Sequence, residues 1–357
     1  MLLNYNVICT VKTLLVLRYL LLVLIYLNIK IFLFSQSYSI KGQFWAIGEF
    51  IENQSDFMPQ LSYIPTLSAY YELSRGKMVD LEWAYRFGRS YIGDSLEEHY
   101  EKPYRGWLRY STQRIEARLG LQKVSFGPAR VLRPLAWFDT IDPKDPIART
   151  EGVESFRLRF FPSNSLALWT WIMKDVSNTL SYGGRGELST NLGEWGFTLH
   201  QDTDVSNTQV GIDFRYDGFI GFWNESVMIK SDNIEIDMIT VGADYTLPIA
   251  SGILIMAESM FISNKQNTIT SDQTFTAFMA MLPLGMVHST MFITQFDWQE
   301  DRVYSYFRWS ATYDKFSLNL LLSQSPKRKE YGIPVEAFPK SVAGFGTGIQ
   351  FMFIYNH

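Results

Sequence analysis

The sequence predicts an all-β fold, a transmembrane antiparallel β-barrel of about 16–18 strands. Three observations support this fold. Apolar and polar residues alternate with a period of two along most of the chain after residue 36, many of the polar positions carry charges of both signs, and aromatic residues make up 16% of the chain. A period of two indicates a β-strand whose two faces meet different surroundings.

The first 36 residues are expected to be an export signal. Residues 14–34 form an apolar run, and no acidic residue occurs before Glu49. A basic flank, an apolar stretch and a small polar exit at residues 35–37 are typical of a secretory signal peptide. The run is longer than the usual ~7–15-residue core, so a retained anchor helix and an over-long start both stay open. We expect a signal peptide at 1–36 and a single barrel domain at 37–357.

The alternation is clearest in residues 79–87, which read V-D-L-E-W-A-Y-R-F. Every odd position is apolar, whereas the even positions carry Asp, Glu, Ala and Arg. No long stretch with the 3.6-residue period of a helix follows residue 40. The same division into two faces recurs in residues 114–122, 155–160, 209–217 and 302–314.

Polar or glycine-bearing breaks such as Ser74-Arg75-Gly76 and Asp217-Gly218 separate these runs, and this is hairpin-turn chemistry. Several of the run boundaries are weak, which leaves the count at about 16–18 strands. The candidate strands lie near residues 40–52, 58–73, 77–88, 102–112, 113–123, 153–161, 165–174, 181–190, 194–202, 207–217, 219–230, 234–247, 251–262, 272–282, 285–298, 302–314, 315–324 and 342–355.

Two kinds of all-β protein share this alternation. A soluble sandwich buries its apolar face, whereas a membrane barrel turns that face to lipid and keeps a polar interior. Charges on the polar face, aromatic residues near strand ends and an export signal favour the barrel. We therefore expect Val79, Leu81, Phe156 and Leu158 to face lipid, and Glu82, Arg118 and Arg157 to face the lumen.

Composition and motifs exclude several other functions. A net charge of -4 gives no basic surface for nucleic acid. Cys9 is the sole cysteine, so a disulfide framework or a cysteine-ligated metal has no basis. The four histidines are scattered, and no nucleophile elbow, zinc-protease motif or P-loop occurs. We expect no metal site, no cofactor and no enzymatic activity.

The segment from Val124 to Thr150 is expected to be a long functional loop. It contains four prolines, which exclude a central strand, and apolar residues such as Trp137 and Phe138 that need burial. Two readings are open: a constriction loop folded into the lumen, or an extracellular cap or a periplasmic plug. In the first reading, the acids of the loop would face arginines on the flanking strands. In the alternative, these charges pair with each other inside a buried plug. The candidate constriction and lumen residues are Asp80, Glu82, Arg114, Glu116, Arg118, Arg130, Arg133, Asp139, Asp142, Asp145, Arg157 and Arg159.

Two stretches resemble a known class. The C-terminal strand places Phe345, Ile349, Phe351, Phe353 and Tyr355 on one face, although Asn356-His357 follow the last aromatic residue. The stretch R-I-E-A-R-L-G-L-Q-K-V-S-F-G-P-A-R at residues 114–130 leads into the proline-rich loop. Both are similar to features of Gram-negative outer-membrane β-barrels of porin type.

This resemblance implies a cell outer-membrane protein that passes small hydrophilic solutes by diffusion. It also implies that the barrel assembly machinery reads the C-terminal strand, and it leaves a homotrimer open. Two other functions remain: a non-conducting or plugged outer-membrane barrel with a binding or structural role, and a secreted all-β carbohydrate-binding protein.

Overall fold

The structure is a computed structural model that describes residues 37–52, 56–174, 178–203, 206–249, 251–266, 269–326 and 346–357. The expected signal peptide at 1–36, Cys9 and Phe345 lie outside the described residues. In the described part of the chain, no helix is long and apolar enough to cross a membrane.

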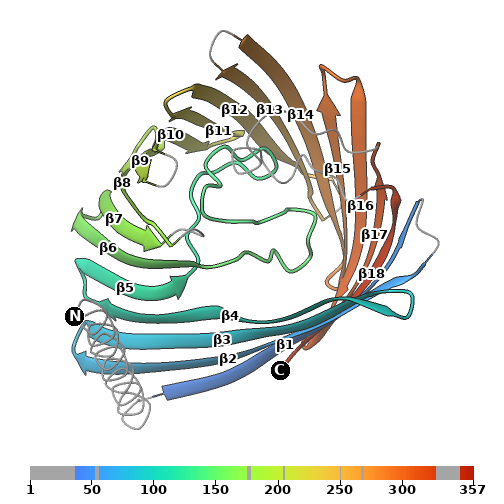
Figure 1. Cartoon of the computed structure of the whole chain (residues 1–357), viewed down its shortest axis with the longest axis horizontal. Coiled ribbons are helices and arrows are strands. Elements are labelled where there is room, and N and C mark those ends of the chain that lie inside the picture. The colour runs from blue at the N-terminus through green and yellow to red at the C-terminus, as the bar shows by residue number, and fades with distance from the viewer. Residues whose placement is uncertain are drawn as a thin grey trace, which may run out of the picture.

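Within the described residues, eighteen antiparallel strands form one sheet, and each strand pairs with its sequence neighbours. Because β1 pairs with both β2 and β18, the sheet closes into a barrel (Figure 1). The expected all-β barrel of about 16–18 strands is therefore confirmed. The strands are β1 (Ser37–Ile51), β2 (Met58–Ser74), β3 (Lys77–Ile92), β4 (Ser95–Ser111), β5 (Ile115–Gln122), β6 (Val153–Ser163), β7 (Leu166–Lys174), β8 (Leu180–Thr190), β9 (Gly193–Asp202), β10 (Asn207–Asp217), β11 (Gly221–Lys230), β12 (Ile234–Leu247), β13 (Ile253–Gln266), β14 (Ile269–Leu284), β15 (His288–Asp297), β16 (Arg302–Thr312), β17 (Phe316–Gln324) and β18 (Gly348–Asn356).

Short turns gather at one end of the barrel, which we call the turn end. The β2–β3 turn there needs a left-handed residue, and Gly76 supplies it with a φ of 77°. Ser37 pairs with Tyr70 near that turn, and the backbone of His357 bonds that of Gly42, so both ends of the described chain lie at this end. The opposite end, which we call the loop end, carries the β5–β6 connection.

Along β5 and β6 the two faces of the wall differ as the alternation predicts. Leu119 and Phe156 are 55% and 43% exposed on the outer face, whereas Arg157 is buried on the inner face at 6%. On β3, Leu81 shares the outer face with Trp83 but is itself buried.

The inner face is not polar throughout, which corrects the expectation of a wet interior. From β11 to β17 it is lined mainly by buried apolar side chains, while outward residues such as Phe222 and Phe261 are apolar as well. The reason is the long loop, because its own apolar residues pack against this half of the wall. The buried inner residues include Val227, Ile229, Met238, Met256, Met260, Phe275, Met279, Met291 and Ile293.

Candidate functional site

The β5–β6 connection, residues 123–152, lies inside the barrel (Figure 1). It leaves the wall partway along β4, because Leu121 near the end of β5 pairs with Gly106 while β4 continues to Ser95. The chain therefore enters the interior from the side of the wall instead of capping the rim. We call residues 123–152 the inner loop.

Two buried carboxylates on the wall hold the first limb of the inner loop. Glu258 on β13 accepts hydrogen bonds from the backbone nitrogens of Arg130, Val131 and Leu132 at 2.7, 2.9 and 2.7 Å. Its fourth bond comes from the indole nitrogen of Trp223 at 3.1 Å. Three successive amides converging on one carboxylate form an anion-binding nest, here filled by a side chain of the protein.

Glu225 on β11 makes a second anchor of the same kind. It accepts the backbone nitrogens of Ala129 at 2.7 Å and Leu135 at 3.1 Å, and its side chain is fully buried. The loop approaches this acid closely at Gly127, where a Cβ atom would stand 2.1 Å from Oε1 of Glu225. Only glycine fits there, since its φ is also left-handed at +82°.

Aromatic packing fixes the loop against β7 and β9. Phe126 lies 5.3 Å from Trp171 between ring centroids, and Phe138 lies 4.9 Å from His200 in an edge-to-face arrangement. The indole nitrogen of Trp171 also bonds Nδ1 of His200 at 3.2 Å. Such ring pairs add about 0.5–1.5 kcal/mol each beyond the burial of area.

The three loop aspartates each pair with a base of the loop itself. Asp139 is held by Arg133 at 2.5 and 2.9 Å. Asp142 lies 3.4 Å from Lys144, and Asp145 lies 2.5 Å from Arg149. The loop acids therefore pair within the loop itself, which is one of the two arrangements that the sequence left open, and not with the strand arginines.

The Arg133–Asp139 pair is the most deeply buried of the three, with side-chain exposures of 8% and 0%. Burial acts to raise the pKa of Asp139, but the hydrogen bonds and positive charge of Arg133 outweigh it and hold that pKa below its ordinary value. Arg133 also bonds Ser125 Oγ at 3.1 Å, so this ion pair crosslinks the start and middle of the loop.

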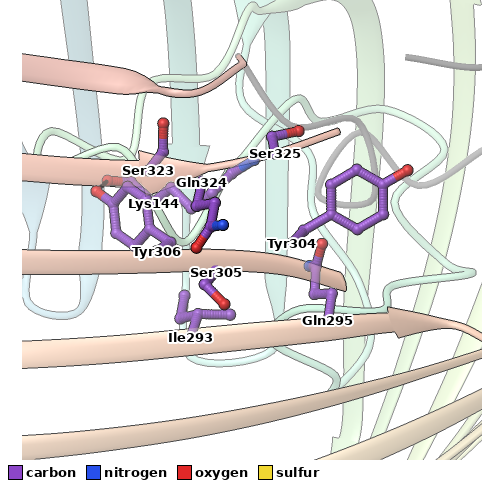
Figure 2. A pocket seen from close by; sticks show the side chains of 9 residues that line it. All are labelled: Lys144, Ile293, Gln295, Tyr304, Ser305, Tyr306, Ser323, Gln324 and Ser325. Carbon is purple, nitrogen blue, oxygen red and sulfur yellow. Dashed lines mark hydrogen bonds between the residues drawn. The ribbon is translucent and has the colours of Figure 1, made fainter. Parts of the chain in front are cut away.

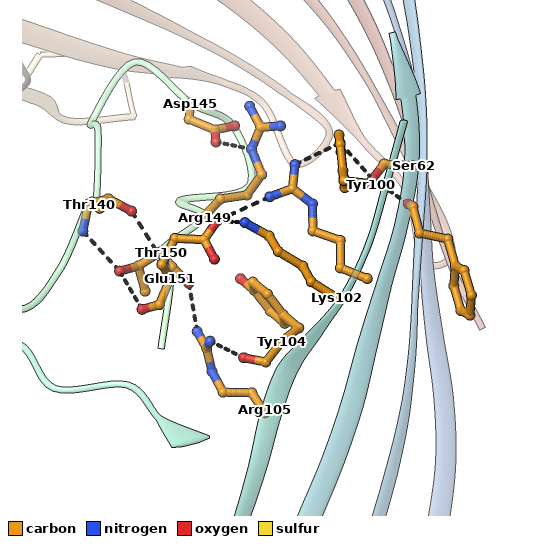
Figure 3. Close-up of polar contacts among 12 residues, drawn as sticks. Ser62, Tyr100, Lys102, Tyr104, Arg105, Thr140, Asp145, Arg149, Thr150 and Glu151 are labelled. Carbon is orange, nitrogen blue, oxygen red and sulfur yellow. Dashed lines mark hydrogen bonds and ion pairs between the residues drawn. The ribbon is translucent and has the colours of Figure 1, made fainter. Parts of the chain in front are cut away.

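The returning limb of the loop is bound to β3 and β4 (Figure 3). Glu151 lies 3.0 Å from Lys102 and 3.4 Å from Arg86. Arg105 donates to the carbonyl of Thr150 at 2.9 Å. The loop is thus anchored on opposite sides of the interior, by β3–β4 and by β11–β13.

A third contact joins the loop tip to β16. The hydroxyl of Tyr306 and a guanidinium nitrogen of Arg308 both donate to the carbonyl of Lys144. A cavity of about 20 Å³ beside this contact, lined by Lys144 and side chains of β15–β17, has room for about one water-sized molecule (Figure 2). Tyr304 and Tyr306 both line this cavity and therefore face inward.

Arginines dominate the inner face of β4–β6. Arg109, Arg118 and Arg157 are direct cross-strand neighbours, and Arg159 lies 3.8 Å above the ring of Trp169. One acid, Glu116, stands among them at 3.6, 3.5 and 3.2 Å from Arg109, Arg118 and Arg157. The Nε atoms of Arg118, Arg157 and Arg159 are buried and make no hydrogen bond within the described residues. We call these four arginines the arginine row.

The structure brings some of the sequence candidates together and separates others. Asp80 binds Arg109 and so joins the arginine row, and Glu82 lies beside it on the same strand face. Arg114 sits exposed in the β4–β5 turn, away from the loop. Arg130 gives its backbone nitrogen to Glu258 while its side chain is exposed.

Sequence reasoning missed Glu225, Glu258, Arg109 and the buried pair of Arg185 with Asp213, whose closest atoms are 2.6 Å apart. For the two glutamates a signal exists. Each is a lone acid on a strand face that is otherwise apolar, and such an acid needs a buried partner. For Arg109 the pairing with Arg118 depends on strand register, which alternation alone does not fix.

No group of three or more metal-ligating side chains occurs in the part of the chain that the structure describes. The polar side chains of the interior are instead suited to forming hydrogen bonds and to interacting with charged solutes.

No protein-family model and no curated protein sequence matches the chain. The fold, however, is similar to solved structures. The outer membrane protein OprD from Pseudomonas aeruginosa has a TM-score of 0.60 at 9% identity, over 91% of this chain and 94% of that one. OccK5 (OpdH) from Pseudomonas aeruginosa gives 0.61 at 8% identity, over 91% and 98%. Acinetobacter baumannii OccAB1 gives 0.60 at 8% identity, over 90% and 96%. The resemblance seen in the sequence is therefore confirmed at the level of the fold.

Proposed function

We propose that the chain is an outer-membrane channel through which small hydrophilic solutes diffuse. The observation that carries this proposal is a closed 18-stranded barrel with a loop anchored across its interior. A barrel of this size leaves an aqueous channel unless something fills it. The inner loop fills part of that space and leaves the charged wall of β3–β6 as the polar surface of the path.

The outer face supports a place in the membrane. Apolar residues such as Leu119, Phe156 and Ile172 stand more than two-fifths exposed on it, which water does not favour but lipid does. Export of the mature domain at 37–357, with removal of residues 1–36, belongs to the same proposal. So does recognition of β18 by the barrel assembly machinery, because Phe351, Phe353 and Tyr355 face outward there.

The charge of the wall favours anions over cations in the path. Four arginines stand against Asp80, Glu82 and Glu116, and the loop acids are neutralised by loop bases. Fixed charges along a narrow pore set ion preference in this way. No catalytic chemistry is proposed for the protein.

The test is single-channel conductance of the purified barrel in a planar bilayer. We expect discrete conductance steps, and deletion of residues 132–146 should enlarge them severalfold because it removes the middle of the inner loop together with its wall contacts at Leu132, Leu135 and Lys144. A heat-modifiable mobility shift on gels checks that both proteins are folded barrels. A folded wild type that conducts nothing, but opens when the segment is deleted, would instead establish the plugged barrel. Equal conductance in both proteins would place the loop outside the conducting path.

A further inference from the structure

A cavity of about 220 Å³ opens on the inner wall near the turn end of the barrel. Its side chains come from four neighbouring strands in register, because Ser37 pairs with Tyr70, Tyr70 with Asp80, and Glu82 with Trp107. They therefore share the inner face of one patch of sheet. The polar and aromatic residues that line the cavity are Ser37, Ser39, Ser68, Tyr70, Asp80, Glu82 and Trp107.

The cavity presents more hydrogen-bonding groups than the protein uses. The hydroxyls of Ser37, Ser39, Ser68 and Tyr70 make no hydrogen bond within the described residues, and neither does the indole nitrogen of Trp107. Each hydroxyl can donate one bond and accept others, whereas the indole only donates. A ligand that fits must therefore offer both donors and acceptors at several points.

The two acids of the cavity differ in their availability. Asp80 is bound on both oxygens by Arg109, at 2.8 and 2.7 Å, so its charge is compensated. Glu82 forms no hydrogen bond or ion pair with a described residue, although it lies within the electrostatic reach of Arg118. The cavity thus holds one free carboxylate, which accepts hydrogen bonds and repels anions.

Trp107 supplies an apolar surface beside these groups. The guanidinium of Arg118 lies 4.4 Å from its ring and that of Arg109 lies 5.7 Å away, so these two arginines of the barrel wall hold the indole in place. A rigid indole next to a set of hydroxyls and a carboxylate matches a sugar ring, which has C–H groups on its faces and hydroxyls around its edge.

Other classes of solute fit less well. A carboxylate-bearing solute meets the negative charge of Glu82. An ammonium ion brings donors only, so it leaves the hydroxyl and indole donors without acceptors. The cavity is also smaller than the ~300–1,000 Å³ that drug-sized ligands occupy, which suits a single sugar ring.

We propose that this cavity is a binding subsite for a neutral monosaccharide. The proposal rests on the proposed function for the role of the subsite, because a solute would meet it near the turn end of the path. Binding itself does not need conduction, so the two can be tested separately.

The experiment measures binding of D-glucose to the purified full-length barrel in detergent by isothermal titration calorimetry. Ser68→Leu fills the cavity with an apolar side chain, and Glu82→Gln replaces the free carboxylate. The matched control is Thr66→Leu, which adds a similar side chain two residues away on the same face of β2 but outside the cavity. A heat-modifiable mobility shift shows that each variant is a folded barrel.

We expect saturable binding by the wild type and by Thr66→Leu, and binding about tenfold weaker or lost in Ser68→Leu. Glucuronate should bind more weakly than glucose, and Glu82→Gln should reduce that difference. The proposal is overturned if the wild type shows no saturable binding, if Ser68→Leu binds as the control does, or if glucosamine binds while glucose does not. A barrel that binds glucose but carries no current keeps the subsite and loses the channel; one that conducts without binding glucose does the reverse.

Discussion

The carboxylate of Glu258 lies 2.7 Å from the backbone nitrogen of Leu132, a residue 126 positions earlier in the chain. The same carboxylate accepts the amides of Arg130 and Val131, and Glu225 accepts two more from the loop. A proline-bearing segment cannot pair its amides in a sheet, yet buried amides must be satisfied. The wall therefore supplies acceptors as side chains, and this determines where the loop sits.

Replacing Glu258 with glutamine should release the first limb of the inner loop. Glutamine keeps one carbonyl oxygen but turns an NH₂ group toward backbone N–H donors, and hydrogen bonds to a charged group contribute about 1.5–3 kcal/mol. We expect protease cleavage within residues 123–152, and noisier and larger single-channel currents. Limited proteolysis with mass spectrometry locates the cuts. The control is Glu235→Gln near the start of β12, whose side chain pairs with Lys265 on the surface. Equal resistance of both variants would show that Glu258 does not hold the loop.

The strands were predictable because apolar and polar residues alternate along a single strand, as in residues 79–87. Loop position was predictable only in part. Four prolines identify a segment that cannot be a strand, but its partners lie on β11 and β13, about a hundred residues away. Glu225 and Glu258 stand out locally as lone acids on apolar strand faces, but which backbone amides they accept becomes visible only when the strands are placed side by side.

The pairing of charges in the loop was likewise predictable only in part from the sequence. Asp139 and Arg133 are six residues apart and pair within the loop, so the segment neutralises itself. The sequence left open both this arrangement and a pairing across the lumen, because opposite charges occur both on the loop and on the strands. Which pairs form depends on how the loop folds back, and composition does not contain that information. The apolar interior of β11–β17 follows from the same fold-back, since Val131 and Leu132 need an apolar surface to cover.

Substituting Gly127 with alanine should displace the loop at its closest approach to the wall. A Cβ atom there would meet Oε1 of Glu225 at 2.1 Å, and the φ of +82° is strained for any residue with a side chain. We expect a loss of about 1–3 kcal/mol in stability, seen as a lower unfolding midpoint in urea, together with altered conductance. Gly106→Ala is the control, because a Cβ atom at that position meets nothing within 4 Å. A Gly127→Ala protein that unfolds like the control would contradict this close approach of loop and wall.

Replacing only one partner of the buried Arg133–Asp139 pair should lower the stability of the protein more than replacing both partners with apolar side chains. Asp139→Asn leaves a buried guanidinium without its counter-charge, and such changes cost about 3–5 kcal/mol, whereas an apolar pair in the same space is often near neutral. We expect Arg133→Met with Asp139→Leu to unfold at a urea concentration closer to wild type than Asp139→Asn alone.

The pH dependence of this pair follows from the lowered pKa of Asp139. A carboxyl whose pKa falls on folding contributes stability above its unfolded value of about 3.9 and loses it as the pH falls through the folded pKa. The difference in stability between wild type and Asp139→Asn should therefore be constant from neutral pH down to about that value and shrink below it. A difference that vanishes already near neutral pH would rule out the ion pair as its cause.

Neutralising Arg157 and Arg159 together as glutamines should shift the selectivity of the channel toward cations. Both lie on the inner face beside Trp169, and their removal leaves Asp80, Glu82 and Glu116 in excess over the remaining arginines of the row. Reversal potentials across a salt gradient measure the shift, which should be largest at low salt, where the Debye length is long. Arg114→Gln serves as the control, because that side chain is exposed in the β4–β5 turn. A shift of the same size in the control would mean that the arginine row does not line the path.

The last prediction concerns which face of the wall meets lipid. Leu158 stands on the outer face of β6, between Phe156 and Phe160, which are 43% and 41% exposed. An arginine placed on a lipid-facing strand near the bilayer midplane costs about 2–4 kcal/mol, whereas the same residue in a wet lumen costs little. Leu158→Arg should therefore fold into lipid vesicles with a lower urea midpoint than wild type. Thr66→Arg, on the inner face of β2, should fold almost as well as wild type. If both variants lose the same stability in vesicles, or if Thr66→Arg loses more, then the faces are assigned the wrong way round or the outer face does not contact lipid.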